Sequence, residues 1–264
     1  MSVAAAARRE VAPLLPMLLA QTRAQVLSYI RIPAFSVTSL ALPLVFYTFF
    51  GLPNANKHFA DGSSVGLYLM CSFGAYAVSS VMVFSFGIGV ATARGQKIDL
   101  LQRATPLPPA ISILANVINA LLYALVAVLV LMAFVLLAAG VRFSIGTAFQ
   151  IVGLLLAGAL PLIGLGMTIG YSSGPNAAPA VANLVYLPMA FASGMFLPID
   201  QLPEFIRTIA HYLPTYHYAQ LAYAPTHHAE EPLGWALVWS GAWAVLLLGL
   251  AVRAYQRDQS RKFS

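Results

Sequence analysis

Six long apolar segments, essentially free of ionisable side chains, are the feature that most constrains this chain. An α-helix needs about 20 apolar residues to cross the hydrocarbon core of a bilayer, and each segment is about that long or longer. Only 8% of the residues are charged, whereas soluble domains typically carry about 25%. The sequence therefore predicts an all-α integral membrane protein with a single transmembrane domain over residues 1–264. The six spans are expected at about 32–51, 65–91, 110–139, 149–169, 177–197 and 233–252.

Lysine and arginine are distributed unevenly between the segments that connect these spans. With six spans, the N-terminal segment, the loop after the second span and the C-terminal tail share one side, which holds eleven of the 14 Lys and Arg residues. The other side holds Lys57, Arg142 and Arg207. Because cytoplasmic loops are enriched in Lys and Arg, this split predicts that both termini are cytoplasmic.

The segment 14–30 precedes the first span and is too short and too polar to cross the membrane. It places Arg23 among apolar residues that include Leu14, Met17 and Leu18. This composition is typical of an amphipathic helix that lies on the membrane surface. An N-terminal helix that is simply exposed to water is the alternative.

The sequence gives little indication of catalytic or cofactor chemistry. The spans lack the acidic or basic side chains that ion-coupled transporters and membrane enzymes place near mid-membrane. No HExxH or GxxxxGK[ST] pattern occurs, and we expect no catalytic residue, metal site or cofactor in this chain. The basic residues lie in short clusters between apolar runs, which argues against nucleic acid as a partner.

The loop between the second and third spans predicts a short helix that prolines terminate. It reads ATARGQKIDLLQRATPLPPA over 91–110, and Ile98, Leu101 and Thr105 recur at helical spacing. A helix over about 95–104 should end before Pro106, because proline disfavours helix in the residue before it. Such a rigid element suits docking to a partner, and an ordinary connecting loop is the alternative. We call it the coupling segment, and its assigned residues are Arg94, Gly95, Ile98, Asp99, Leu101, Gln102, Arg103, Thr105 and Pro106.

A second polar interruption, SGMFLPIDQLPEFIRTIAHYLP over 193–214, follows the fifth span. Its apolar residues from Leu202 to Leu213 stand at helical spacing and form one stripe. We expect a short helix over 202–213 that lies at the outer surface or re-enters the membrane, with Pro214 at its end. It acts as an exit gate or merely shapes the end of the fifth span. We call it the outer segment, and its assigned residues are Gly194, Phe196, Pro198, Pro203, Phe205, Ile206, Ile209 and Pro214.

Together these features resemble the ABC-2 type membrane permeases of ATP-binding-cassette exporters. RATPLPP at 103–109 resembles the coupling-helix segment of that family. SGMFLPIDQLPEFIRTIAHYLPTYH at 193–217 resembles its glycine–aromatic–proline turn and short outer helix. The order of surface helix, spans and coupling helix is also similar, and the ATPLPP variant is most similar to the branch that exports drugs and lipids.

The resemblance implies a transport subunit that is not itself an enzyme. It would form the translocation path as a dimer with an identical or related permease, in the bacterial inner membrane and in contact with lipid. Two separate ATPase subunits would hold ATP and magnesium and grip the coupling segment through Ile98, Leu101 and Arg103. The cargo implied is a hydrophobic or amphipathic drug, lipid or glycolipid. A membrane enzyme or a non-transporting assembly protein is the alternative.

Overall fold

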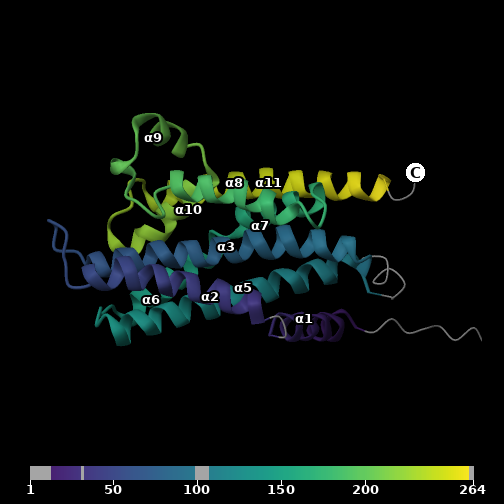
Figure 1. The fold of residues 1–264 in the computed structure, drawn as a ribbon, viewed down its shortest axis with the longest axis horizontal. Coiled ribbons are helices and arrows are strands. Elements are labelled where there is room, and N and C mark those ends of the chain that lie inside the picture. The colour runs from purple at the N-terminus through teal and green to yellow at the C-terminus, as the bar shows by residue number, and fades with distance from the viewer. Residues whose placement is uncertain (1–12, 31–32, 99–106, 262–264) are drawn as a thin grey trace, which may run out of the picture.

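The computed structural model describes residues 13–30, 33–98 and 107–261, and almost all of its regular structure is helical (Figure 1). Within those residues the only β pairing is an isolated bridge between His58 and Ser64. The all-α prediction is therefore confirmed for the described part of the chain. The α-helices are α1 Leu14–Ile30, α2 Pro33–Phe46, α3 Val65–Gly95, α5 Pro109–Ala138, α6 Ile145–Ala157, α7 Leu160–Ser172, α8 Ala178–Ala192, α9 Glu204–Ala210, α10 Pro214–Tyr223 and α11 Leu233–Arg261.

Helix α3 is the centre of the bundle and packs against α2, α5, α7, α8 and α10. Its first turn is capped by Ser64, whose hydroxyl accepts a hydrogen bond from the Leu67 amide at 3.2 Å. In α3, 83% of the most apolar stretch is buried inside the chain, compared with 28% in α11. The sequence of α3 is apolar all round because it faces other helices, whereas α11 exposes apolar side chains that suit lipid or a second subunit.

Glycines allow α7 to approach the backbone of α3 closely. A Cβ atom at Gly166 would lie 2.9 Å from the carbonyl oxygen of Met82, and one at Gly170 would lie 2.6 Å from that of Phe86. Small residues at such a crossing let two membrane helices pack backbone to backbone. The two helices therefore form a tightly packed pair inside the chain.

The fourth apolar segment is broken into α6 and α7. A Cβ atom at Gly158, between them, would lie 2.8 Å from the side chains of Tyr218 and Leu221 on α10. Pro161 lies in the first turn of α7, where backbone N–H groups have no partner within the helix, so the N–H that proline lacks is not needed. The break thus makes room for α10 against the fourth segment.

Four helical segments are long and apolar enough to cross a membrane among the residues described: α3, α5, the α6–α7 pair and α11. The first predicted span is occupied by α2, a π-helical turn at Tyr47–Gly51 and a 3₁₀ turn at Leu52–Asn54. The fifth is occupied by α8. The apolar helices at 40–54 and in α8 are shorter than the other four, so six crossings stay a prediction.

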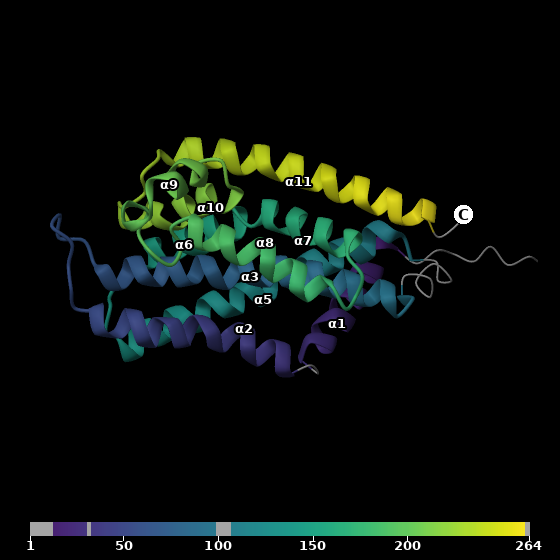
Figure 2. The ribbon, with the colours of Figure 1, turned by 45° about the horizontal axis from the view of Figure 1, so that its top comes forward.

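The helices run between two ends of the molecule, as both ribbon views show (Figures 1 and 2). Helix α1, the last turn of α3, the first turn of α5 and the last turns of α11 lie at one end, which we call the basic end. Residues 55–64 and α9 lie at the opposite end. The uneven distribution of Lys and Arg in the sequence therefore corresponds to two ends of one bundle.

Helix α1 packs beside α5 at the basic end. Leu14, Leu15 and Leu19 are each at least 60% exposed. These leucines suit contact with a membrane surface. The structure confirms a helix at the predicted 14–30, and its position on the bilayer stays a prediction.

Candidate functional site

Arg94, assigned to the coupling segment, lies in the last turn of α3 and binds two other helices. Its Nη1 donates to the carbonyl oxygens of Gly170 at 2.7 Å and Ser173 at 3.1 Å, at the end of α7. Its Nη2 donates to Asp258 on α11. Arg94 also lies over the ring of Tyr171, with 5.9 Å between its Cζ and the ring centroid. One side chain therefore joins α3, α7 and α11.

The Arg94 contacts are strong for two physical reasons. Hydrogen bonds between charged groups are roughly twice as strong as neutral ones. The Gly170 and Ser173 carbonyls lie at the negative end of the α7 helix dipole, which favours a cation there. Asp258 is only 8% exposed. Removing the Arg94 guanidinium would therefore leave a buried negative charge without its partner, which costs more than at the surface.

Gly95 ends α3 rather than beginning a separate helix. A Cβ atom there would lie 2.7 Å from Cγ of Pro175, in the loop between α7 and α8. The chain then turns through Lys97, whose φ of 57° is incompatible with a continuing helix. The end of α3 thus lies against the loop between α7 and α8 at the basic end.

The rest of the coupling segment is described only in part. Ile98 is 37% exposed and is the last described residue before the gap. Asp99, Leu101, Gln102, Arg103, Thr105 and Pro106 lie outside the described residues. Their helix and their contacts with a partner stay predictions.

At the opposite end, the turn that begins the outer segment is fixed to the bundle. Gly194 has a φ of 82°, a conformation that favours glycine, and its carbonyl accepts a 2.8 Å bond from the Tyr223 hydroxyl. The Ser72 hydroxyl of α3 donates to the carbonyl of the next residue, Met195. Phe196 then packs in an aromatic cluster, with its ring centroid 5.0 Å from that of Tyr76. The glycine–aromatic turn therefore has a defined structural role.

The helix of the outer segment, α9, is shorter than the predicted 202–213. It begins after Pro203, and Leu202 and Leu213 flank it. Phe205 is 66% exposed and Ile209 is 53% exposed. Two residues of the predicted stripe thus face outward, where lipid or another subunit can contact them, whereas Leu202 and Leu213 pack against a small buried cluster. Ala210 is buried against Ile199 and Tyr216, which fixes α9 to the bundle at its C-terminal end.

Pro214 begins a helix where the sequence suggested that it only ends one. All ten residues of α10 are buried. Proline is favoured in the first turn of a helix because its φ is already helical and its missing N–H is not needed there. The sequence therefore contained a signal for a helix that starts at Pro214. The polar side chains of His217 and Gln220, however, gave no indication that this helix is buried.

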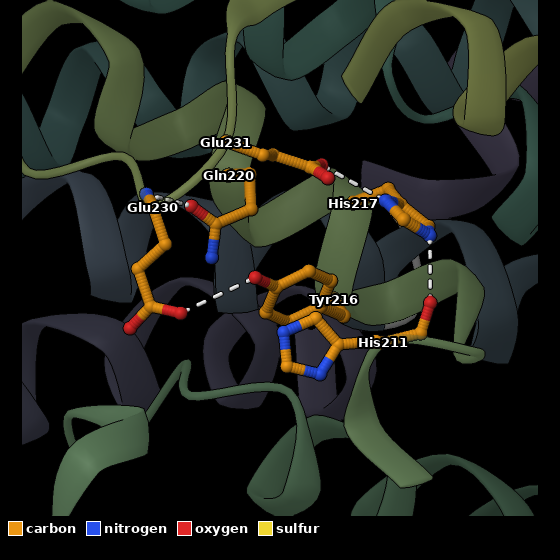
Figure 3. A network of polar contacts seen from close by, with 6 residues as sticks. All are labelled: His211, Tyr216, His217, Gln220, Glu230 and Glu231. Atoms are coloured by element: carbon orange, nitrogen blue, oxygen red, sulfur yellow. Dashed lines mark hydrogen bonds and ion pairs between the residues drawn. The ribbon is translucent and has the colours of Figure 1, made fainter. Parts of the chain in front are cut away.

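The polar residues of α10 are satisfied by a network that joins α9, α10 and the loop before α11 (Figure 3). His217 contacts a Glu231 carboxyl oxygen through Nδ1 at 2.8 Å and the His211 carbonyl oxygen through Nε2 at 3.0 Å. The Tyr216 hydroxyl donates to Glu230 at 3.2 Å, and the Glu230 amide donates to Gln220 at 2.7 Å. Glu230 and Glu231 therefore hold a buried helix in place.

His217 carries a specific protonation requirement. Its ring is 2% exposed and stacks on Trp239 of α11, with centroids 5.2 Å apart. A carbonyl oxygen only accepts hydrogen bonds, so Nε2 must carry a hydrogen. Nδ1 contacts the Glu231 carboxyl group, so His217 and Glu231 form a buried hydrogen-bonded pair.

Residues 55–64 are tied to the loop before α11 at the same end. Ser63 donates to Asp61 Oδ1 through its hydroxyl at 2.6 Å and its amide at 3.0 Å, which lowers the pKa of the Asp61 carboxyl. His228 contacts the Ser63 hydroxyl and lies 3.6 Å from Asp61 Oδ2. No group of three potential metal ligands lies together among the described residues.

These features define a multi-pass membrane protein with an arginine-fixed loop at one end and a folded-back, buried helix at the other. The chain belongs to the ABC-2 type transporter family, whose sequence model matches residues 17–224. That match includes both the coupling segment and the outer segment. The chain is also 27% identical over 204 residues to YvfS of Bacillus subtilis (strain 168), which is named as a transport permease; the match covers 77% of this chain and 82% of YvfS. The resemblance in the sequence is confirmed, and the family is one of transport permeases rather than of catalytic enzymes.

Proposed function

We propose that this permease subunit exports a hydrophobic or amphipathic molecule, such as a drug, a lipid or a glycolipid, with energy from two separate ABC ATPase subunits. The observation that carries the proposal is the position of Arg94. It lies where the coupling segment begins and is bonded to both α7 and α11. A force applied to the coupling segment would therefore move α3, α7 and α11 together. Rigid-body movement of packed helices is an established way to convert a local event into alternating access.

A second permease subunit, identical or related, would complete the path. Aromatic side chains of α3 and α8 pack on one another inside this chain, for example Tyr76 on Tyr186 with ring centroids 6.2 Å apart. Tyr186 is fully buried, so it belongs to the internal packing rather than to an open passage. Helix α11 meanwhile exposes most of its apolar stretch. These observations favour a path between two chains over a path through one.

The docking of the ATPase is tested with the double variant Leu101→Glu and Arg103→Glu. We expect it to insert into the membrane as the wild type does but to lose co-purification with the ATPase and transport of drugs and lipids in inverted vesicles. The matched control is Arg142→Glu, a charge reversal at the opposite end, which should keep both properties. Normal ATPase binding and stimulation in the double variant would contradict the proposed docking role.

The alternative is an assembly protein that binds an ATPase without moving a substrate. The same vesicles separate the two functions, because transport must depend on ATP hydrolysis whereas assembly need not. If the ATPase co-purifies but no compound in a panel of amphipathic drugs and lipids accumulates with ATP, the assembly function is favoured instead.

A further inference from the structure

A cavity of about 520 Å³ lies at the basic end, between the ends of α3, α7 and α11. Arg94, Arg253, Arg257 and Asp258 all line it. Three positive charges against one negative charge leave the lining with a surplus of two. Its volume is within the range of about 300–1,000 Å³ that is typical of small-molecule sites.

The arginines reach the cavity from different elements. Arg253 and Arg257 are one turn apart on α11, so they share a face of that helix, and both are exposed. Arg94 comes from α3 on the other side, and its buried Nε has no hydrogen-bond partner among the described residues. The hydroxyl-bearing residues Thr168 and Ser172 of α7 also line the cavity. Guanidinium groups from α3 and α11 thus line one space together with Ser172 of α7, while the Thr168 hydroxyl already donates to the Gly164 carbonyl at 2.8 Å.

This set of groups is suited to a phosphate group. The guanidinium fork matches the oxygens of a phosphate and can donate two parallel hydrogen bonds to it. Basic pockets between membrane helices on the cytoplasmic side are also where anionic lipid headgroups bind. The basic end is the side that the Lys and Arg distribution assigns to the cytoplasm.

We propose that this cavity binds a phosphate group, either in the headgroup of an anionic phospholipid or as a soluble phosphate. The bound group would connect α11 to α7 and α3 beside the Arg94–Asp258 pair. The proposal rests on the lining of the cavity alone, so it does not depend on the proposed transport function.

The test uses the full chain, purified in a neutral detergent and stripped of lipid. Native mass spectrometry measures binding of phosphatidylglycerol and of diacylglycerol, which lacks the phosphate, and the thermal midpoint is recorded with phosphate or chloride at equal ionic strength. We expect phosphatidylglycerol to bind at least about tenfold more tightly than diacylglycerol, which corresponds to about 1.4 kcal/mol. A higher thermal midpoint in phosphate than in chloride would identify soluble phosphate as a ligand. Binding of phosphatidylglycerol without such a rise would identify the lipid as the ligand.

The variant Arg253→Gln with Arg257→Gln removes the two exposed guanidinium groups and should weaken this binding about tenfold or more. The matched control is Arg142→Gln with Arg207→Gln at the opposite end, which should bind as the wild type does. Because Arg253 and Arg257 are exposed, we expect both variants to fold. Equal affinity of the cavity variant and the wild type, or equal binding of diacylglycerol and phosphatidylglycerol, would overturn the proposal. In the wild type, a phosphatidylglycerol affinity that does not fall with added salt would also overturn it.

Discussion

Arg94 shows how much one residue can determine at the boundary between a membrane bundle and its loops. The sequence identified it by its place before the coupling segment, and the structure gives the physical content of that assignment. Its guanidinium bonds to two carbonyls of α7 and to Asp258, which is 164 positions further along the chain. No pattern in the sequence relates Arg94 to Asp258, because the fold alone brings the two helix ends together.

Replacing Arg94 with Met should destabilise the protein. The change leaves the buried Asp258 carboxylate without the Arg94 guanidinium, and breaking a buried ion pair from one side costs about 3 kcal/mol. Equilibrium unfolding of the purified protein in micelles measures the loss. The double variant Arg94→Met with Asp258→Leu should recover part of it, since both charges are then removed. An unfolding free energy equal to that of the wild type in the single variant would show that the pair is not a structural link.

Replacing His217 with Phe should weaken the attachment of α10. Phenylalanine keeps a ring that can stack on Trp239 but loses the bonds to Glu231 and to the His211 carbonyl. Leaving buried acceptors unsatisfied costs about 1–3 kcal/mol each. The expected result is a lower thermal midpoint and faster hydrogen exchange in 214–223. His227→Asn is the matched control, because His227 is exposed and asparagine tolerates its positive φ of 63°; a similar loss in both variants would contradict a specific role of His217.

At the scale of elements, the outer segment contains one helix that the local sequence pattern predicted, and it is followed by α10, which the pattern did not predict. The amphipathic spacing in 202–213 predicted a short helix at the outer surface, and the structure has the seven-residue helix α9 within that range. The structure shortens it, because Pro203 fixes its start and the chain turns after Ala210 to enter α10. Helix α10 was missed because its burial depends on partners, Glu230, Glu231 and Trp239, that follow later in the sequence.

The gate function of α9 is tested by a proline inside it. Ile206 lies in the first turn, where proline is tolerated, so Thr208→Pro is the sharper change. A proline in a helix interior costs about 3 kcal/mol, which a seven-residue helix cannot absorb, so α9 should unfold locally. We expect transport to fall several-fold at equal expression, while Thr208→Ala transports as the wild type does. Unchanged transport by the proline variant would favour the alternative that this segment only shapes the end of the fifth span.

For the whole molecule, composition and long apolar runs predicted the class of protein, because the bilayer permits few other solutions. The structure has four long apolar helical segments among the described residues, and the helix ends that border the basic segments lie at one end. The sequence could not predict that the fourth segment breaks between α6 and α7. Glycine and proline are frequent in membrane helices, so Gly158 and Pro161 do not by themselves indicate a break. Its reason is the side chains of Tyr218 and Leu221, which occupy the space that the glycine leaves.

The orientation of the whole chain gives a further prediction. If the basic end is cytoplasmic, green fluorescent protein fused after Ser264 should fluoresce, and alkaline phosphatase inserted at Gly62 should be active outside. Gly62 suits the insertion because a side chain there would meet nothing within 4 Å. The reciprocal fusions, phosphatase after Ser264 and fluorescent protein at Gly62, should both be inactive. A reversed pattern would place the coupling segment out of reach of a cytoplasmic ATPase.

The buried position of α10 has a consequence for how this chain is made. Ten residues that include His217 and Gln220 are too few and too polar to be inserted as a membrane segment on their own. Helix α10 packs on α3, α6 and α11, and α11 is synthesised after it. Its packing can therefore be complete only when α11 is beside it. The last contact to form at this end of the bundle is then the stacking of Trp239 on His217.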